Sequence, residues 1–168
     1  MNADYVKATA QTGDGLGVHG SSAEQEVIQA LTGILCHVAP LLRMPNGELI
    51  IAEMIEPHGY RTISFDDWMQ ERTGQVIFFL QAPDAVRQGG DKIIARQALY
   101  KDAQARNYAF EDLPLVLLSQ ITGKKYDTGG EVCSEKYADD YAAAGQVVPG
   151  NPSPTDFVFL SESVAMLR

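Results

Sequence analysis

Residues 34–55 read ILCHVAPLLRMPNGELIIAEMI. They form two apolar, β-favouring runs, Ile34 to Leu42 and Glu48 to Ile55, on either side of a short break. The break contains Asn46-Gly47, and this dipeptide readily adopts the positive φ angles that a tight hairpin turn needs. The stretch therefore predicts an antiparallel β-hairpin at the centre of the fold.

One histidine and one glutamate interrupt these apolar runs. If the turn is centred on Pro45, His37 lies opposite Glu53, with Cβ atoms about 5 Å apart on one face of the sheet. Such a pair would satisfy a carboxylate that is costly to bury alone, and it would hold the imidazole in one tautomer. A register centred between Pro45 and Asn46 would instead place Met54 opposite His37. The sequence leaves both registers open.

The rest of the chain alternates short strands with helices. Residues 1–12 are polar and irregular and are predicted to form a flexible N-terminal arm ahead of a single domain, residues 13–168. Strands are expected at 16–19, 60–63, 75–80 and 156–160, and helices from Ser64 through Trp68, over 91–108 and over 134–144. These elements predict an α+β fold with a central antiparallel sheet flanked by helices.

Composition excludes several classes of function. The chain has 168 residues, 45% of them hydrophobic, and a formal net charge of −9. A binder of nucleic acid needs a basic stripe, whereas the longest basic run here is Lys124-Lys125. No apolar stretch approaches the ~20 residues of a membrane span, and the N-terminus lacks the features of a signal peptide. We therefore expect no nucleic-acid partner, no integral membrane segment and a cytoplasmic location by default.

Cys133 lies where a glycine-flanked loop, residues 123–130, turns into a predicted helix. The partial positive charge and unpaired N–H groups of a helix N-terminus favour a thiolate and could hold an oxyanion. Glu135 opposes a thiolate by its charge, and a buried, inert cysteine remains the alternative. Cys36 would point away from the face that carries His37, which predicts a structural role; the two thiols are expected to be reduced.

A thiol nucleophile needs a base, and the chain has three histidines: His19, His37 and His58. His37 is either that base or a satisfied core residue. Glu53 is the candidate to orient it, although Glu56 and His58 lie close in sequence. A zinc site built from His58, Glu53 and Glu56 is the metal alternative. Because the chain lacks His-x-x-x-His and Cys-x-x-Cys pairs, we expect neither a metal nor another cofactor.

Aromatic residues have simpler interpretations. Trp68 and Phe65 are predicted to form a helix face packed on the sheet. Tyr137 and Tyr141 repeat at helical spacing and are predicted to belong to the core.

The order of these motifs resembles a known family. Gly33 to Ala39, Asn46 to Leu49, Ala52-Glu53 and, much later, Val132 to Glu135 follow one another as in the circularly permuted NlpC-type papain-like enzymes, the YaeF/YiiX-like group. In that group the histidine strand precedes the cysteine helix. The resemblance covers roughly residues 13 to 160. Pro40 departs from it, because proline removes a ladder donor from the histidine strand and favours a bulge.

The resemblance implies a permuted papain-like (NlpC-type) fold, with a sheet or half-barrel flanked by helices. It implies Cys133 as the nucleophile, His37 as the base, Glu53 as the third polar residue and Tyr126 as part of the oxyanion site. The expected activity is thiol-dependent hydrolysis of amide or peptide bonds, as in a cysteine peptidase or amidase, with no cofactor.

The substrate class stays open at this point. Cell-wall (peptidoglycan) peptides lead, and lipid amides or esters, or acyl transfer to them, are the alternative. A phage-borne or injected enzyme would reconcile a cell-wall substrate with the missing export signal. A non-catalytic binding module on the same fold is the rival class, and the oligomeric state is left open.

Overall fold

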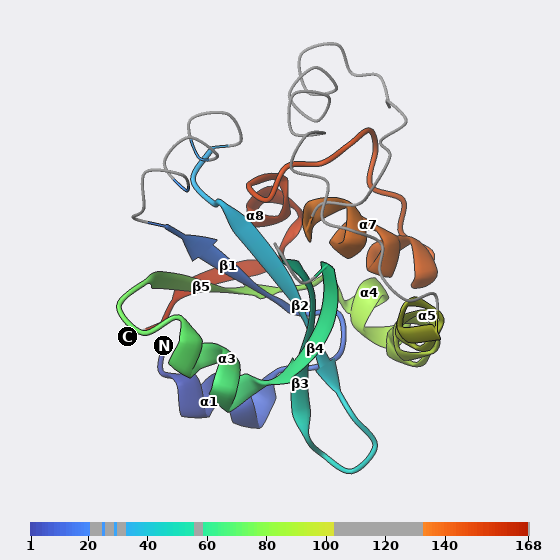
Figure 1. The fold of residues 1–168 in the computed structure, drawn as a ribbon. Coiled ribbons are helices and arrows are strands. Elements are labelled where there is room, and N and C mark those ends of the chain that lie inside the picture. The colour runs from blue at the N-terminus through green and yellow to red at the C-terminus, as the bar shows by residue number, and fades with distance from the viewer. Residues whose placement is uncertain (21–24, 26–28, 30–32, 56–58, 103–132, 168) are drawn as a thin grey trace.

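The computed structural model describes residues 1–20, 25, 29, 33–55, 59–102 and 133–167 (Figure 1). Its centre is a six-stranded antiparallel sheet with the strand order β4-β3-β2-β1-β5-β6. The strands are β1 (Gly15–His19), β2 (His37–Arg43), β3 (Leu49–Ile55), β4 (Gly59–Ser64), β5 (Val76–Gln81) and β6 (Ser163–Met166). The predicted hairpin is β2–β3, and β5 lies inside the sheet as its apolar sequence indicates.

Helices cover both faces of the sheet. They are α1 (Ala3–Thr9), α3 (Phe65–Glu71), α4 (Asp84–Gln88), α5 (Gly90–Asp102), α7 (Cys133–Ala143) and α8 (Asp156–Leu160). Figure 1 shows α1 and α3 together on one side of the sheet, with α4, α5 and α7 on the other. The mixed α+β architecture, with an antiparallel sheet between helices, is therefore as predicted.

The two faces of the sheet bury separate apolar clusters. Along β2, Ala39 and Leu41 belong to the cluster beneath α1 and α3, whereas Val38 and Leu42 belong to the cluster beneath α7. Successive side chains of a strand point to opposite faces, so a strand covered on both sides reads as a continuous apolar run. This explains why the hairpin sequence shows no polar alternation.

β2 changes partner at Pro40. From His37 to Pro40 it pairs with β1, and from Leu41 to Arg43 it pairs with β3. Proline has no N–H to donate to a ladder, and Leu41 donates instead to the Asp14 carbonyl at 2.7 Å. At Pro40 the strand β2 therefore exchanges its pairing with β1 for pairing with β3. His37 lies in the part of β2 that pairs with β1.

Two expectations differ from the structure. Residues 3–9, expected to lie in a flexible arm, form α1; Val6 is fully buried, and the Arg43 guanidinium donates to the carbonyls of Lys7 and Ala10. The buried side chains of Val6 and Ala10 and three hydrogen bonds from Arg43 to two carbonyls anchor this segment.

Residues 156–160, expected to be a strand, form α8. The Asp156 carboxylate accepts hydrogen bonds from the Ser153 backbone and hydroxyl, which starts a helical turn. In the part of the chain that the structure describes, no helix has the length and apolar character needed to cross a membrane.

Candidate active site

His37 is the first residue of β2, held in place by the segment that leads into it. The Cys36 amide donates to the Val18 carbonyl at 2.9 Å, and the Leu35 amide donates to Thr155 Oγ1 at 3.0 Å. His37 itself is the cross-strand partner of Val18 on β1. Its backbone is therefore fixed from both sides, and its side chain is only 13% exposed.

The register of the β2–β3 hairpin is neither of the two expected from sequence. Leu41 pairs with Ile51 and Arg43 with Leu49, which centres the turn on Asn46. Moving the centre by one residue from Pro45 slides the pairing by two, and a two-residue slide keeps every side chain on its original face. His37 and Glu53 consequently still face the same side, although they are not directly opposite each other.

The predicted contact between these two residues is present. His37 Nε2 lies 2.7 Å from Glu53 Oε2. An ionised carboxylate can only accept, so Nε2 carries the hydrogen and Nδ1 is the nitrogen left for the nucleophile.

Glu53 is fully buried and accepts hydrogen bonds from four side chains. Besides His37, the donors are Arg61 on β4, Trp68 on α3 and Arg72, the residue that follows α3. Each side chain brings at least one bond of 3.1 Å or less. Two guanidinium groups thus compensate the cost of burying this carboxylate.

Cys133 is the first residue of α7 and is 2% exposed. Its side chain neighbours His37, and the interaction between them is the largest of those that raise the His37 pKa. Glu135, which could repel a thiolate, has a carboxylate that accepts a hydrogen bond from Asn151 Nδ2 at 2.6 Å. The structure therefore brings together Cys133, His37 and Glu53, residues that are far apart in sequence.

Helix α7 is held against β1 by close packing. Tyr137 Oη donates to the Gly13 carbonyl at 2.8 Å, and the ring passes over Gly15. A Cβ atom at Gly15 would lie 2.5 Å from Tyr137 Oη, so the approach requires a glycine there. Tyr137 and Tyr141 are buried as predicted.

The ionisation of the site follows from these contacts. Burial lowers the pKa of His37, but Cys133 and then Glu53 outweigh it and raise this pKa to about 9. Burial raises the pKa of Glu53, yet His37, Arg72 and Trp68 bring it down to about 2. Glu53 is therefore ionised across the physiological range and favours an imidazolium next to Cys133.

Cys36 has the properties of a structural thiol. It is 5% exposed, packs in the cluster beneath α1 and α3, and donates to the Val18 carbonyl. Burial and the neighbouring Cys133 raise the pKa of Cys36 to about 11. This thiol is protonated at neutral pH.

The remaining candidates are not brought to this site within the described residues. Tyr126, Glu56 and His58 lie outside them. His19 is exposed, and its Nδ1 lies 2.8 Å from Gln29 Nε2. No group of three or more His, Cys, Asp or Glu side chains that could hold a metal occurs in the described part of the chain. Both Glu53 oxygens already accept from arginine, so this carboxylate does not fit a metal-ligand role.

Three contacting residues were not predicted as part of a site: Arg61, Trp68 and Arg72. Arg61 is the direct cross-strand partner of Glu53. The sequence could have predicted this pair only if the turn between β3 and β4, and therefore their register, had been known. Trp68 and Arg72 are four residues apart, a spacing that places them on one face of a helix. That spacing is the only signal the sequence offers for the second pair.

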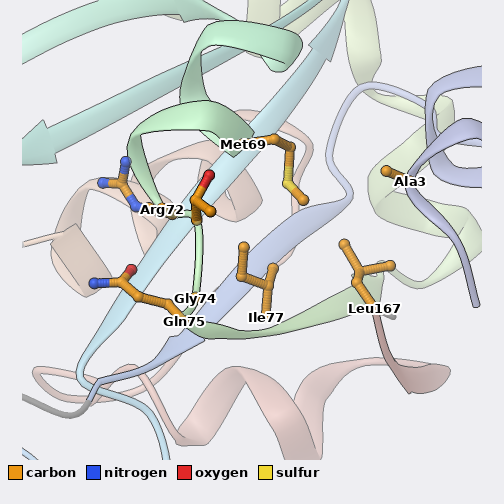
Figure 2. Close-up of a pocket in the computed structure, with 8 residues that line it drawn as sticks. Ala3, Met69, Arg72, Gly74, Gln75, Ile77 and Leu167 are labelled. Atoms are coloured by element: carbon orange, nitrogen blue, oxygen red, sulfur yellow. The ribbon is translucent and has the colours of Figure 1, made fainter.

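A cavity of about 250 Å³ lies behind this cluster, between α1, α3 and β5. Ala3, Met69, Ile77 and Leu167 form apolar walls, and Arg72 also contributes (Figure 2). Figure 2 shows the Arg72 guanidinium turned away from Ile77 and Leu167. Arg72 therefore borders the cavity and also donates to Glu53.

Comparison with known proteins shows a likeness to solved structures but not to known sequences. No protein-family model and no curated protein matches the sequence. The structure is similar to the crystal structure of the metalloprotein YiiX from Escherichia coli O157:H7, described as DUF1105, with a TM-score of 0.62 and 14% sequence identity. The match covers 94% of this chain and 96% of that one. Such a likeness concerns the fold alone, and it is consistent with a papain-like architecture for this antiparallel sheet and its flanking helices.

Proposed function

We propose that this chain is a thiol-dependent hydrolase that cleaves amide or peptide bonds through a thioester on Cys133. The observation that carries the proposal is the position of the His37 imidazole, which neighbours the Cys133 side chain and is hydrogen-bonded to the buried Glu53 carboxylate. A nucleophile, a base and a group that orients the base are the minimum set for covalent acyl transfer.

The reaction would proceed in two balanced halves. His37 takes the proton of Cys133, and the thiolate attacks the amide carbonyl, whose oxyanion is held by backbone N–H groups at the start of α7. The imidazolium gives its proton to the departing amine, which leaves the acyl group on sulfur. His37 then takes a proton from water, the hydroxide attacks the thioester, and the acid and the free thiol are released.

The charges around the site are balanced in number. Glu53 and Glu71 carry two negative charges and contact Arg61 and Arg72, which carry two positive charges. A thiolate and an imidazolium add one charge of each sign, so the cluster stays neutral. Transfer of the proton from Cys133 to His37 separates charge within this cluster, and the Glu53 carboxylate stabilises the resulting imidazolium.

The chain order of the site supports membership in the permuted papain-like group. The histidine lies on β2 and the cysteine on α7, so the base precedes the nucleophile in sequence. The likeness to YiiX extends over nearly the whole of both chains. We propose peptide bonds of bacterial cell walls as the leading substrates, with lipid amides and esters as the next class to screen.

Thiol alkylation provides the test of this function. We expect iodoacetamide to label Cys133 rapidly at pH about 6, because the neighbouring imidazole can take its proton, whereas an ordinary thiol reacts appreciably only near pH 8.5. Mass spectrometry after digestion follows each cysteine separately between pH 5 and 9. Cys36 is the internal control, since it is as buried as Cys133 but protonated over this range.

The His37→Ala variant completes the experiment. It should slow the labelling of Cys133 at pH 6 by at least tenfold, the effect of one pKa unit. A folded protein in which Cys133 reacts no faster than Cys36, or reacts equally fast without His37, would contradict the proposed function. Such a result would favour a non-catalytic binding module.

A further inference from the structure

The two oxygens of Glu53 share Arg72 as a partner but otherwise differ. Oε1 accepts from Arg61 Nε and Nη2, at 2.9 and 2.6 Å, and from Arg72 Nη2 at 3.4 Å. Oε2 accepts from His37 Nε2 at 2.7 Å, from Trp68 Nε1 at 2.9 Å and from Arg72 Nη2 at 3.1 Å. The oxygen that faces the base is therefore also held by the indole and by the second arginine.

Trp68 and Arg72 also hold each other. The Arg72 guanidinium stacks over the Trp68 ring, with Cζ 4.0 Å from the ring centroid. Trp68 is fully buried and Arg72 is 7% exposed. Because the two side chains share a packed face, the donor atoms they aim at Glu53 have little freedom to move.

We propose that Trp68 and Arg72 are positioning residues that fix Glu53 Oε2 as the acceptor for His37 Nε2–H. They act on Cys133 only through Glu53 and His37, so this inference rests on the proposed function. Without them the carboxylate can turn about its terminal bond, which is rotationally soft. The hydrogen bond to the imidazole would then be made only part of the time.

The indole N–H distinguishes this role from simple core packing. Phe65, three residues earlier on α3, is buried in the same apolar cluster as Trp68 and needs no polar group to fill its place. Trp68 fills a similar place but aims its one donor at the oxygen that bonds the base. Arg61 donates to Oε1, so Trp68 and Arg72 supply the hydrogen bonds that hold Oε2 besides that of His37.

The test compares Trp68→Phe with Phe65→Leu. Trp68→Phe keeps an aromatic ring and changes no charge, whereas Phe65→Leu perturbs the same cluster and helix without touching Glu53. We expect Trp68→Phe to slow alkylation of Cys133 at pH 6 by about three- to tenfold, as half to one pKa unit at His37 would. It should also broaden or abolish the downfield proton NMR signal of His37 Nε2–H. Phe65→Leu should change neither property, whatever its melting temperature.

Arg72→Lys is the second variant and guards against a failure of Trp68→Phe to fold. Lysine keeps the positive charge but lacks the planar group that stacks on the indole while reaching the carboxylate. We expect it to reduce the Nε2–H signal and the alkylation rate in the same direction.

The outcomes separate the two proposals. If wild-type Cys133 depends on His37 but Trp68→Phe and Arg72→Lys retain wild-type rates and an intact Nε2–H signal, the positioning role is wrong and the function stands. A faster reaction in Trp68→Phe would also overturn it, because loss of a donor would then act only by making Glu53 more basic. If wild-type Cys133 does not depend on His37, the function itself fails.

Discussion

At the scale of single residues, a buried carboxylate next to an imidazole can orient the ring and can stabilise its charged form. Glu53 fixes the ring by accepting from Nε2, and it stabilises the imidazolium by its charge. Cys133 is the larger of the two influences that raise the His37 pKa, and Glu53 is the second. A substitution that removes only the charge of Glu53 therefore has a defined direction.

In Glu53→Gln the side chain keeps its shape but loses its charge. We expect the His37 pKa to fall from about 9 toward 6.5, because burial then acts against a weaker opposing interaction. A titration of the His37 Cε1–H signal by two-dimensional NMR measures this shift.

Glu71→Gln is the matched control for that titration. The Glu71 carboxylate bonds to Arg61 and Arg72, as Glu53 does, but His37 is not among its recorded partners. Equal pKa values for His37 in the two variants would mean that the general charge of the cluster, rather than the direct contact, sets the pKa.

At the scale of elements, the position of the nucleophile depends on how closely α7 approaches β1. Gly15 and Tyr137 make this contact, and Tyr137 lies one turn of helix after Cys133. Tyr137 also stacks on Phe157 of α8, with ring centroids 4.4 Å apart, so it has little room to retreat. The contact between Gly15 and Tyr137 therefore helps to set the position of Cys133.

Gly15→Ala should displace α7. Its new methyl group would overlap the Tyr137 ring, and overpacking of this kind costs about 1–3 kcal/mol. We expect a lower free energy of unfolding in urea and slower alkylation of Cys133. Gly47→Ala is the control, since its Cβ meets nothing within 4 Å and its positive φ makes it costly without reaching the site. Equal alkylation rates in the two variants would contradict this link between packing and nucleophile.

The hairpin shows what the sequence could and could not predict. Two apolar runs and Asn46-Gly47 were enough to predict β2 and β3, because local periodicity and turn chemistry decide such elements. The register depends on which residues close the turn, and here the Met44 amide donates to Glu48 and the Gly47 amide to Met44. The sequence alone could not show whether this turn, centred on Asn46, is more stable than one centred on Pro45.

The candidate site was predictable in part for the same reason. His37 and Glu53 stood out as polar residues in apolar strands, and Cys133 as a thiol at the start of a helix. Arg61 and Trp68 gave no such contrast, because an arginine in a half-exposed strand and an aromatic on a packed helix face are ordinary. Only the tertiary packing of α3 and β4 on β3 brings their donors to Glu53.

At the scale of the whole molecule, the sheet separates two buried carboxylates with opposite pKa shifts. Glu53 lies beside the arginines and Trp68, and its pKa falls to about 2. Asp140 is buried on α7; burial raises its pKa to about 6 against the opposing pull of Lys136, which donates to it at 2.8 Å. Burial destabilises both anions, and the cations and other hydrogen-bond donors within reach outweigh it at Glu53 but not at Asp140.

These shifts predict how stability changes in acid. Glu53 has a lower pKa in the folded than in the unfolded protein, so its contribution is present above pH 4.5 and is lost as the pH falls toward 2. Asp140 has the opposite sign: its raised pKa adds stability as the pH falls from 6 to 3.8. The contributions of Glu53 and Asp140 to the free energy of unfolding change over largely different pH ranges. A variant of either residue can therefore isolate the contribution of that residue.

Urea unfolding of wild type and Glu53→Gln at pH 6, 4.5 and 3 tests this directly. The difference in the free energy of unfolding between the two proteins should shrink by about 1.6 kcal/mol between pH 4.5 and 3, since about 1.2 pH units of linkage at 1.36 kcal/mol each are lost there. Between pH 6 and 4.5 the difference should shrink by only about 0.4 kcal/mol, because the unfolded Glu53 is no more than half protonated at pH 4.5. A difference that does not change down to pH 3 would mean that Arg61, Arg72 and His37 do not stabilise the Glu53 anion, and the electrostatic basis of the proposed ion pair would be lost with it.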